Sequence, residues 1–136
     1  MKLILFVIGL TFLSVDAFSQ KSIQDKSKLM LSGKKVYDMY CQACHQADGN
    51  GVPRLNPPLT GTVYVTGNKT RLIDIVLNGL TDPLEINGEE YNNPMAAHSF
   101  LTDQQIADVL TYIRNSFGNK AGVVTAAEVK KQRAKK

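Results

Sequence analysis

The spacing of apolar positions divides the chain into helices separated by turns. Residues 27–43 predict a helix whose apolar positions are Leu29, Val36, Tyr37 and Tyr40. Residues 68–78 predict a second helix, with Asn68 as its N-cap and Gly79 as its stop. The apolar stripe of this second helix consists of Leu72, Ile73, Val76 and Leu77. Residues 20–26 are polar and predict a disordered lead-in.

The C-terminal half contains the clearest helix signal. Thr102 and Gln105 form a capping box, after which apolar residues follow at helical spacing up to Gly118: Ile106, Val109, Leu110, Ile113 and Phe117. Thr125 and Glu128 open a short last helix in the same way. Residues 48–61 predict a rigid loop, and residues 84–91 a small hairpin around an Asn-Gly turn. Because nothing else resembles a strand, the predicted fold class is all-α.

The N-terminus has the organisation of a secretory signal peptide. Lys2 precedes an apolar run from Leu3 to Leu13, and Ala17-Phe18-Ser19 forms a small-x-small cleavage site. The run is shorter than the roughly 20 residues that a membrane-spanning helix needs. No cysteine lies near the site, which excludes a bacterial-type lipid anchor. We therefore expect cleavage after Ser19, with an uncleaved N-terminal anchor as the alternative.

The positive charge of the chain is concentrated at its C-terminus. The net charge is +4, and five of the last seven residues are basic: Lys130, Lys131, Arg133, Lys135 and Lys136. Residues 20–129 contain ten basic and eleven acidic side chains, so a basic nucleic-acid-binding face is not expected. We expect the tail to be solvated and mobile, with a salt-sensitive contact to a membrane surface or a partner as the alternative.

The segment Cys41-Gln42-Ala43-Cys44-His45 contains the only two cysteines of the chain and matches the c-type haem attachment signature. Positions i and i+3 share a helix face, so both thiols can reach the two vinyl groups of one porphyrin while His45 directs its imidazole at the iron. A redox-active pair would follow a strand in a βαβ unit, and a zinc site would need further ligands. The sequence therefore predicts covalently attached haem c, which in bacteria is attached outside the cytoplasm.

With this motif, residues 33–118 resemble a class I cytochrome c. Gly33 and Tyr37 lie eight and four residues before Cys41. The resemblance implies that the N- and C-terminal helices cross around the haem, closely at Gly33 and against the ring of Tyr112.

The resemblance also implies two residues that support the haem. The segment Pro57-x-Leu59-x-Gly61 resembles the family segment in which a proline carbonyl accepts the Nδ1–H of the haem-ligand imidazole. Pro57 is thus the candidate partner of His45, and Leu59 is a candidate haem-packing residue.

The second axial ligand is expected from a loop just before the C-terminal helix. The family takes a methionine there, and Met95 lies in the corresponding segment Asn93-Pro94-Met95-Ala96-Ala97, with proline before the methionine instead of after it. His98 is the rival ligand in the same loop. With His45 and Met95 as ligands, the protein is expected to be a one-electron carrier and not an enzyme. The alternatives are a peroxidase-like haem enzyme or a haem-based sensor with an open or His98-ligated distal side.

Charge along the chain suggests how a redox partner is met. From Leu72 to Ile113 there is no Lys or Arg and seven acidic residues: Asp74, Asp82, Glu85, Glu89, Glu90, Asp103 and Asp108. Residues 21–71 instead carry eight basic and three acidic side chains. This is either ordinary solvated surface or a dipolar molecule whose acidic side steers encounters with a partner.

Together these features predict the organisation of the chain. We expect a signal peptide at residues 1–19, a lead-in and helix start at 20–32, a cytochrome c domain at 33–118, and a C-terminal extension with a short helix and basic tail at 119–136. The expected function is a periplasmic monohaem cytochrome that serves a dehydrogenase, an oxidase or another cytochrome, with no stable membrane insertion after signal cleavage.

Overall fold

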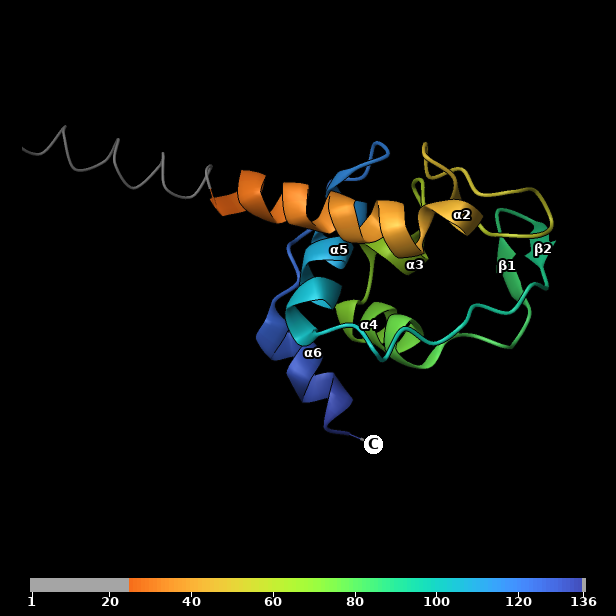
Figure 1. Cartoon of the computed structure of the whole chain (residues 1–136). Coiled ribbons are helices and arrows are strands. Elements are labelled where there is room, and N and C mark those ends of the chain that lie inside the picture. The colour runs from red at the N-terminus through yellow and green to blue at the C-terminus, as the bar shows by residue number, and fades with distance from the viewer. Residues whose placement is uncertain (1–24, 136) are drawn as a thin grey trace, which may run out of the picture.

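The computed structural model of the chain describes residues 25–135, and the expected signal peptide lies outside them. The described part is mainly helical, which confirms the all-α prediction (Figure 1). An N-terminal helix covers residues 25–40. It is followed by α2 (Gln42–His45), α3 (Val63–Thr66), α4 (Lys69–Asn78), α5 (Asp103–Asn115) and α6 (Ala126–Arg133). The antiparallel hairpin predicted around Asn87-Gly88 consists of β1 (Leu84–Ile86) and β2 (Glu89–Tyr91).

Three helices begin at the caps that the sequence predicts. The side chain of Asn68 accepts the backbone N–H of Arg71 at the start of α4. Thr102 closes a capping box at the start of α5, and Thr125 does so at the start of α6. Each cap satisfies backbone donors that have no partner within the first turn of a helix.

Other boundaries differ from the predictions. Residues 25 and 26 are helical instead of disordered. Once a helix has formed, each residue added to its end gains one backbone hydrogen bond, which favours this extension. The N-terminal helix ends at residue 40, before Cys41, and the short α3 was not predicted.

Phe117 does not belong to α5, contrary to the predicted stripe. The helix ends at Asn115 because the last carbonyls find partners outside it. The Ile113 carbonyl accepts from the Asn119 side chain at 2.9 Å, and the Arg114 carbonyl accepts from the Ala121 N–H at 3.0 Å. Phe117 then takes a left-handed backbone conformation (φ 57°).

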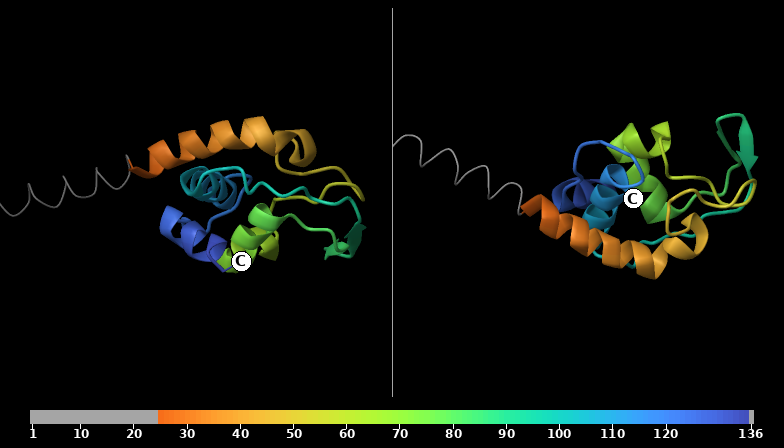
Figure 2. Two further views of the ribbon diagram at one scale, coloured as in Figure 1. Left: turned by 60° about the horizontal axis from the view of Figure 1, so that its bottom comes forward. Right: turned by 90° about the horizontal axis from the view of Figure 1, so that it is seen from above.

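The N-terminal helix lies across α5, as the two views of Figure 2 show. At the crossing, a Cβ on Gly33 would clash with the Asp108 carbonyl oxygen and lie 2.6 Å from Cβ of Tyr112. The ring of Tyr37 packs beside those of Tyr112 and Phe117, with centroid separations of 5.5 and 5.3 Å. The predicted contact of Gly33 and Tyr37 with Tyr112 is therefore confirmed.

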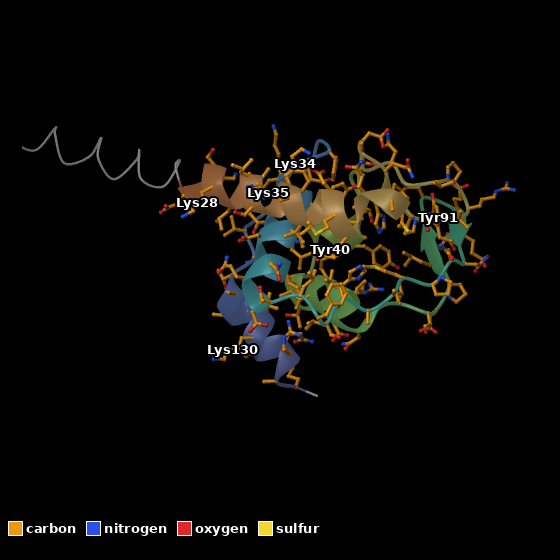
Figure 3. The ribbon with its side chains drawn as sticks, viewed as in Figure 1. Lys28, Lys34, Lys35, Tyr40, Tyr91 and Lys130 are labelled. Atoms are coloured by element: carbon orange, nitrogen blue, oxygen red, sulfur yellow. The ribbon has the colours of Figure 1, made fainter. Side chains whose placement is uncertain are left out.

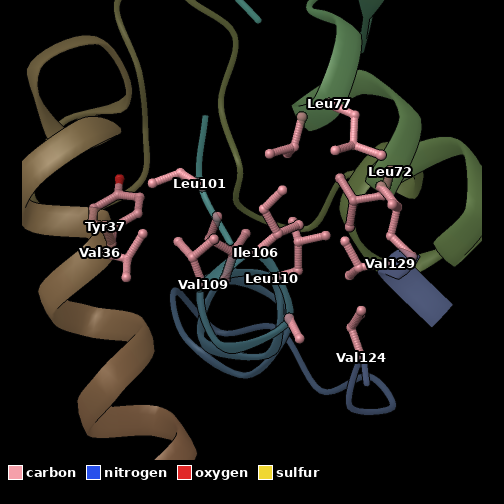
Figure 4. Packing of buried hydrophobic residues seen from close by; sticks show 14 of the residues in the cluster. Val36, Tyr37, Leu72, Leu77, Leu101, Ile106, Val109, Leu110, Val124 and Val129 are labelled. Atoms are coloured by element: carbon pink, nitrogen blue, oxygen red, sulfur yellow. The ribbon is translucent and has the colours of Figure 1, made fainter. Parts of the chain in front are cut away.

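The hydrophobic core lies between the N-terminal helix, α4, α5 and α6. Figure 4 shows Val36 and Tyr37 facing Val109 on one side of α5, with Leu72 of α4 and Val129 of α6 on the other. Val129 is completely buried. The helix that follows residue 118 thus shares the core of the preceding helices.

The basic tail is helical up to Arg133. Lys130, Lys131 and Lys135 are exposed, as expected of solvated residues, but Arg133 is half-buried and hydrogen-bonded. The expectation of a solvated tail is therefore wrong for Arg133, because partners within reach replace its hydration. Within residues 25–135, no helix is long and apolar enough to cross a membrane.

Candidate haem site

A single helical turn presents the two cysteines and the histidine of the predicted attachment motif. Cys41 is the N-cap of α2, and its carbonyl accepts the backbone N–H of His45 at 2.9 Å. Cys41 and His45 are half-buried and Cys44 is exposed, and all three line one cavity. The spacing of the motif therefore places two thiols and an imidazole on the same wall.

The orientation of His45 is fixed by the loop that follows it. Its Nδ1 lies 3.0 Å from the carbonyl oxygen of Pro57, as predicted for this residue pair. Because a carbonyl can only accept, Nδ1 carries the proton and Nε2 keeps its lone pair for a metal ion. Burial lowers the pKa of His45, and the bond to Pro57 opposes this shift. The imidazole is therefore held neutral, which is the form that ligates iron.

Close backbone packing brings Pro57 to this position. Gly51 adopts φ 66° and donates its N–H to the His45 carbonyl at 3.0 Å. A Cβ at Gly51 would lie 2.6 Å from the Pro57 carbonyl oxygen, so glycine is required for both the conformation and the approach.

Leu59 lines the cavity two residues further along and is held by Asn119. The Asn119 side chain donates to the Leu59 carbonyl and accepts the Gly61 N–H, both at 2.9 Å. Asn119 is buried, and no pattern in the sequence marks it. A single asparagine in a turn has no periodic signal, and its partners Leu59 and Gly61 are about 60 positions away.

The opposite wall contains both candidate distal ligands. Met95 forms a two-bond antiparallel bridge with Leu80, with N···O distances of 3.0 and 2.8 Å. The N–H of His98 donates to the Val76 carbonyl at 2.8 Å. Residues 95–101, called here the Met95 loop, are thus attached to α4. Figure 1 shows this segment passing from β2 to α5 on the side opposite α2.

Met95 and His98 differ in their surroundings. Met95 is half-buried and packs against the hydrophobic core. His98 packs beside the exposed Phe100, and its Nδ1 lies 2.9 Å from the Ala96 carbonyl oxygen. That contact leaves Nε2 of His98 with a free lone pair, so both residues can ligate iron chemically.

The cavity between these walls has a volume of about 360 Å³. Its remaining lining is mostly apolar and comes from α4, α5, the hairpin and the end of the Met95 loop, including Leu72, Val76, Val109, Ile113, Ile86 and Leu101. Tyr40 of the N-terminal helix and Tyr91 of β2 also line it (labelled in Figure 3). The Asn93 side chain donates to that of Asn56 at 2.7 Å, which connects the two loops that carry Met95 and Pro57. Thiols and an imidazole on one wall, a thioether on the other and an apolar interior fit a haem.

The thiol chemistry differs from that of a catalytic redox pair. Burial, followed by the neighbouring Cys44, raises the pKa of the free Cys41 thiol to about 11. Reactive cysteines instead have lowered pKa values, because the thiolate is the nucleophile. The site favours a structural use of Cys41.

The acidic stretch separates into two groups in the structure. Asp108 is buried beside the helix crossing and Asp103 is paired with Arg133, so neither contributes to an open acidic surface. Glu85 and Glu90 are exposed and face each other across the hairpin, in a register that places like charges together. Lys28, Lys34 and Lys35 lie on the N-terminal helix, at a distance from the hairpin (Figure 3).

An apolar cavity between helices, with paired thiols and an imidazole on one wall, defines a haem protein of the c type. Residues 31–117 match the family "Cytochrome c", and the chain belongs to this family. The predicted cytochrome c fold is thereby confirmed, and the cofactor is covalently attached haem c.

Individual relatives agree with this membership. The chain is 40% identical over 113 residues to cytochrome c-552 of Thermus thermophilus, covering 76% of this chain and 86% of the relative. It is 45% identical over 104 residues to the cytochrome c subunit of alcohol dehydrogenase (quinone) of Komagataeibacter europaeus, covering 74% of this chain and 22% of that subunit. The gluconate 2-dehydrogenase cytochrome c subunit of Pantoea cypripedii is 41% identical over 105 residues, with coverages of 72% and 23%.

Proposed function

We propose that this protein carries one electron at a time between redox partner proteins, with His45 and Met95 as the axial ligands of its haem c. The main support is that both residues line the same apolar cavity from opposite sides. His45 is held there by Pro57, and Met95 by its bridge to Leu80. When bound, haem c supplies an iron that alternates between the ferrous and ferric states.

The side chains of this protein would set the properties of that iron. His45 is held neutral and oriented by Pro57, so that Nε2 is available as a ligand. Methionine as the partner of a histidine ligand raises the reduction potential. Leu59, Leu101 and Val109 line the cavity with apolar side chains. An apolar surrounding of the iron also affects its reduction potential.

His98 remains the alternative ligand, because its Nδ1 contact with Ala96 leaves Nε2 free within the same cavity. Ligation by His98 would give a lower potential, and a distal side without a strong ligand would favour a peroxidase-like enzyme or a sensor. Met95→Ala and His98→Ala distinguish these functions. We expect Met95→Ala to lower the potential and permit carbon monoxide binding, while His98→Ala does neither. Exchanged phenotypes would assign the ligand role to His98.

We further propose that the protein acts in the periplasm, after cleavage of residues 1–19. The apolar run, the Ala17-Phe18-Ser19 site and the covalent haem support this location. The test is the N-terminal sequence of the holoprotein recovered from the periplasm of a Gram-negative host. We expect it to begin at Gln20; an uncleaved chain in the membrane fraction would contradict the proposal.

The proposed partner is a dehydrogenase, an oxidase or another cytochrome. The similarity to cytochrome c subunits of alcohol and gluconate dehydrogenases supports a dehydrogenase. The exposed Glu85 and Glu90 lie on the hairpin whose Leu84, Ile86 and Tyr91 line the haem cavity, which supports encounter with a basic partner on this side.

A further inference from the structure

Arg133, the last residue of α6, binds the end of the Met95 loop and the first residue of α5. Its Nε donates to the Asp103 carboxylate at 2.8 Å. Its two terminal nitrogens donate to the carbonyl oxygens of Ser99 and Leu101, both at 2.7 Å. All three guanidinium nitrogens therefore donate to acceptors within residues 99–103.

These contacts complete the attachment of the Met95 loop. The backbone of Met95 is bonded to Leu80, and the His98 N–H is bonded to Val76 of α4. Beyond His98, the carbonyls at positions 99 and 101 are bound by Arg133. Leu101 is 3% exposed and lines the cavity that contains Met95. The loop is thus held at Met95 by Leu80, at His98 by α4, and at its end by Arg133 of α6.

The chemistry of these contacts is suited to fixing a loop. Hydrogen bonds from a charged donor are stronger than neutral ones, and the planar guanidinium defines the direction of each. The side chains of Arg133 and Asp103 are 32% and 29% exposed, so water only partly screens the pair. Asp103 lies in the first turn of α5 and Arg133 in the last turn of α6, where the helix dipoles favour these charges.

We propose that Arg133 is a positioning residue that keeps the Met95 loop closed and so maintains Met95 as the distal ligand of the haem. The inference rests on the proposed ligation by Met95. Arg133 lies outside residues 31–117, which match the family, so this contact is an addition of the C-terminal extension to the haem site.

The test measures how readily an added ligand displaces Met95. Imidazole is titrated into the ferric holoprotein, and the weak red absorption band of methionine–iron ligation is followed. Arg133→Gln removes the charged donor but keeps a similar chain length. We expect it to raise the apparent affinity for imidazole on the order of tenfold, because each hydrogen bond to a charged group is worth at least that factor. Arg133→Lys should restore only part of the wild-type value, since one ammonium cannot reproduce the three directions.

Two control variants separate positioning from charge and from general stability. Lys131→Gln removes an equal charge from an exposed position of α6. Val129→Ala weakens the packing of α6 and keeps the Arg133 side chain with its three donor nitrogens. Both should leave imidazole affinity within about twofold of the wild type, although Val129→Ala lowers the unfolding temperature. Asp103→Asn, which weakens the anchor of the Arg133 side chain, should raise the affinity less than Arg133→Gln.

Three results would overturn the proposal. In the first, Arg133→Gln and Lys131→Gln have the same imidazole affinity, so Arg133 has no specific role. In the second, Val129→Ala increases imidazole affinity as much as Arg133→Gln does, so Arg133 contributes only to general stability. A wild-type ferric protein without the red band would refute ligation by Met95 and the positioning role with it. That last result is seen before any variant is compared, so the two failures are distinguishable.

Discussion

Replacing Gly33 with valine should destabilise the crossing of the N-terminal helix and α5. Even the first carbon of a side chain at this position would clash with the Asp108 carbonyl oxygen and lie 2.6 Å from Cβ of Tyr112. The Asp108 backbone belongs to a packed helix and cannot rotate away as the end of a long side chain can. Overpacking in a core costs about 1–3 kcal/mol, and we expect the upper half of this range, about 2–3 kcal/mol. The higher helix propensity of valine offsets less than about 0.5 kcal/mol of this loss.

The assay is chemical unfolding of the ferric holoprotein, followed by far-UV circular dichroism. Lys35→Val is the matched control, because it introduces the same side chain at an exposed position of the same helix. This control should change the free energy of unfolding by no more than about 0.5 kcal/mol. If Gly33→Val were as stable as the control, the close crossing would not be a determinant of this fold.

Two further predictions concern charge. The ammonium group of Lys69 donates a hydrogen bond to the Glu128 carboxylate at 2.9 Å, and this bond lowers the pKa of that carboxyl from its ordinary value of 4.5. The pair therefore stabilises the folded protein above the ordinary pKa, and this stabilisation is lost as the pH falls through the folded-state pKa. In Glu128→Gln, the unfolding temperature should therefore fall less steeply as the pH is lowered into the acid range. An equally steep fall in this variant would contradict the pairing. Electron exchange with a basic acceptor should slow as salt rises, since charges interact over about 8 Å at physiological ionic strength. Stopped-flow rates should lose most of this dependence when Glu85, Glu89 and Glu90 are replaced by Gln; the opposite salt slope would indicate the lysine-rich helix as the docking face.

The features that sequence predicted correctly depend on short-range spacing. The caps at Asn68, Thr102 and Thr125 act within three or four residues, so they are visible in the sequence. The same holds for the hairpin turn and for the CxxCH segment. The bond between His45 and Pro57 was anticipated only through the resemblance to a family, because its partners are twelve positions apart across an irregular loop.

The features that sequence did not predict depend on contacts between distant residues. Arg114 has no signal in the sequence, yet it is buried and donates to the carbonyls of Val65, Gly67 and Gly122. Asn119 and Arg133 likewise bind main-chain carbonyls across 30 or more positions. Carbonyl acceptors belong to every residue, so no residue type in the sequence marks such a partner.

The visible absorption spectrum of the purified holoprotein in both redox states, with and without carbon monoxide, tests the central claim most directly. We expect a ferric spectrum with the weak red band of methionine–iron ligation. We also expect a ferrous spectrum that carbon monoxide leaves unchanged, since the proposed ligation by His45 and Met95 fills both axial positions. Rapid binding of carbon monoxide by the wild-type ferrous protein, together with a missing red band, would contradict an electron carrier with a closed distal side.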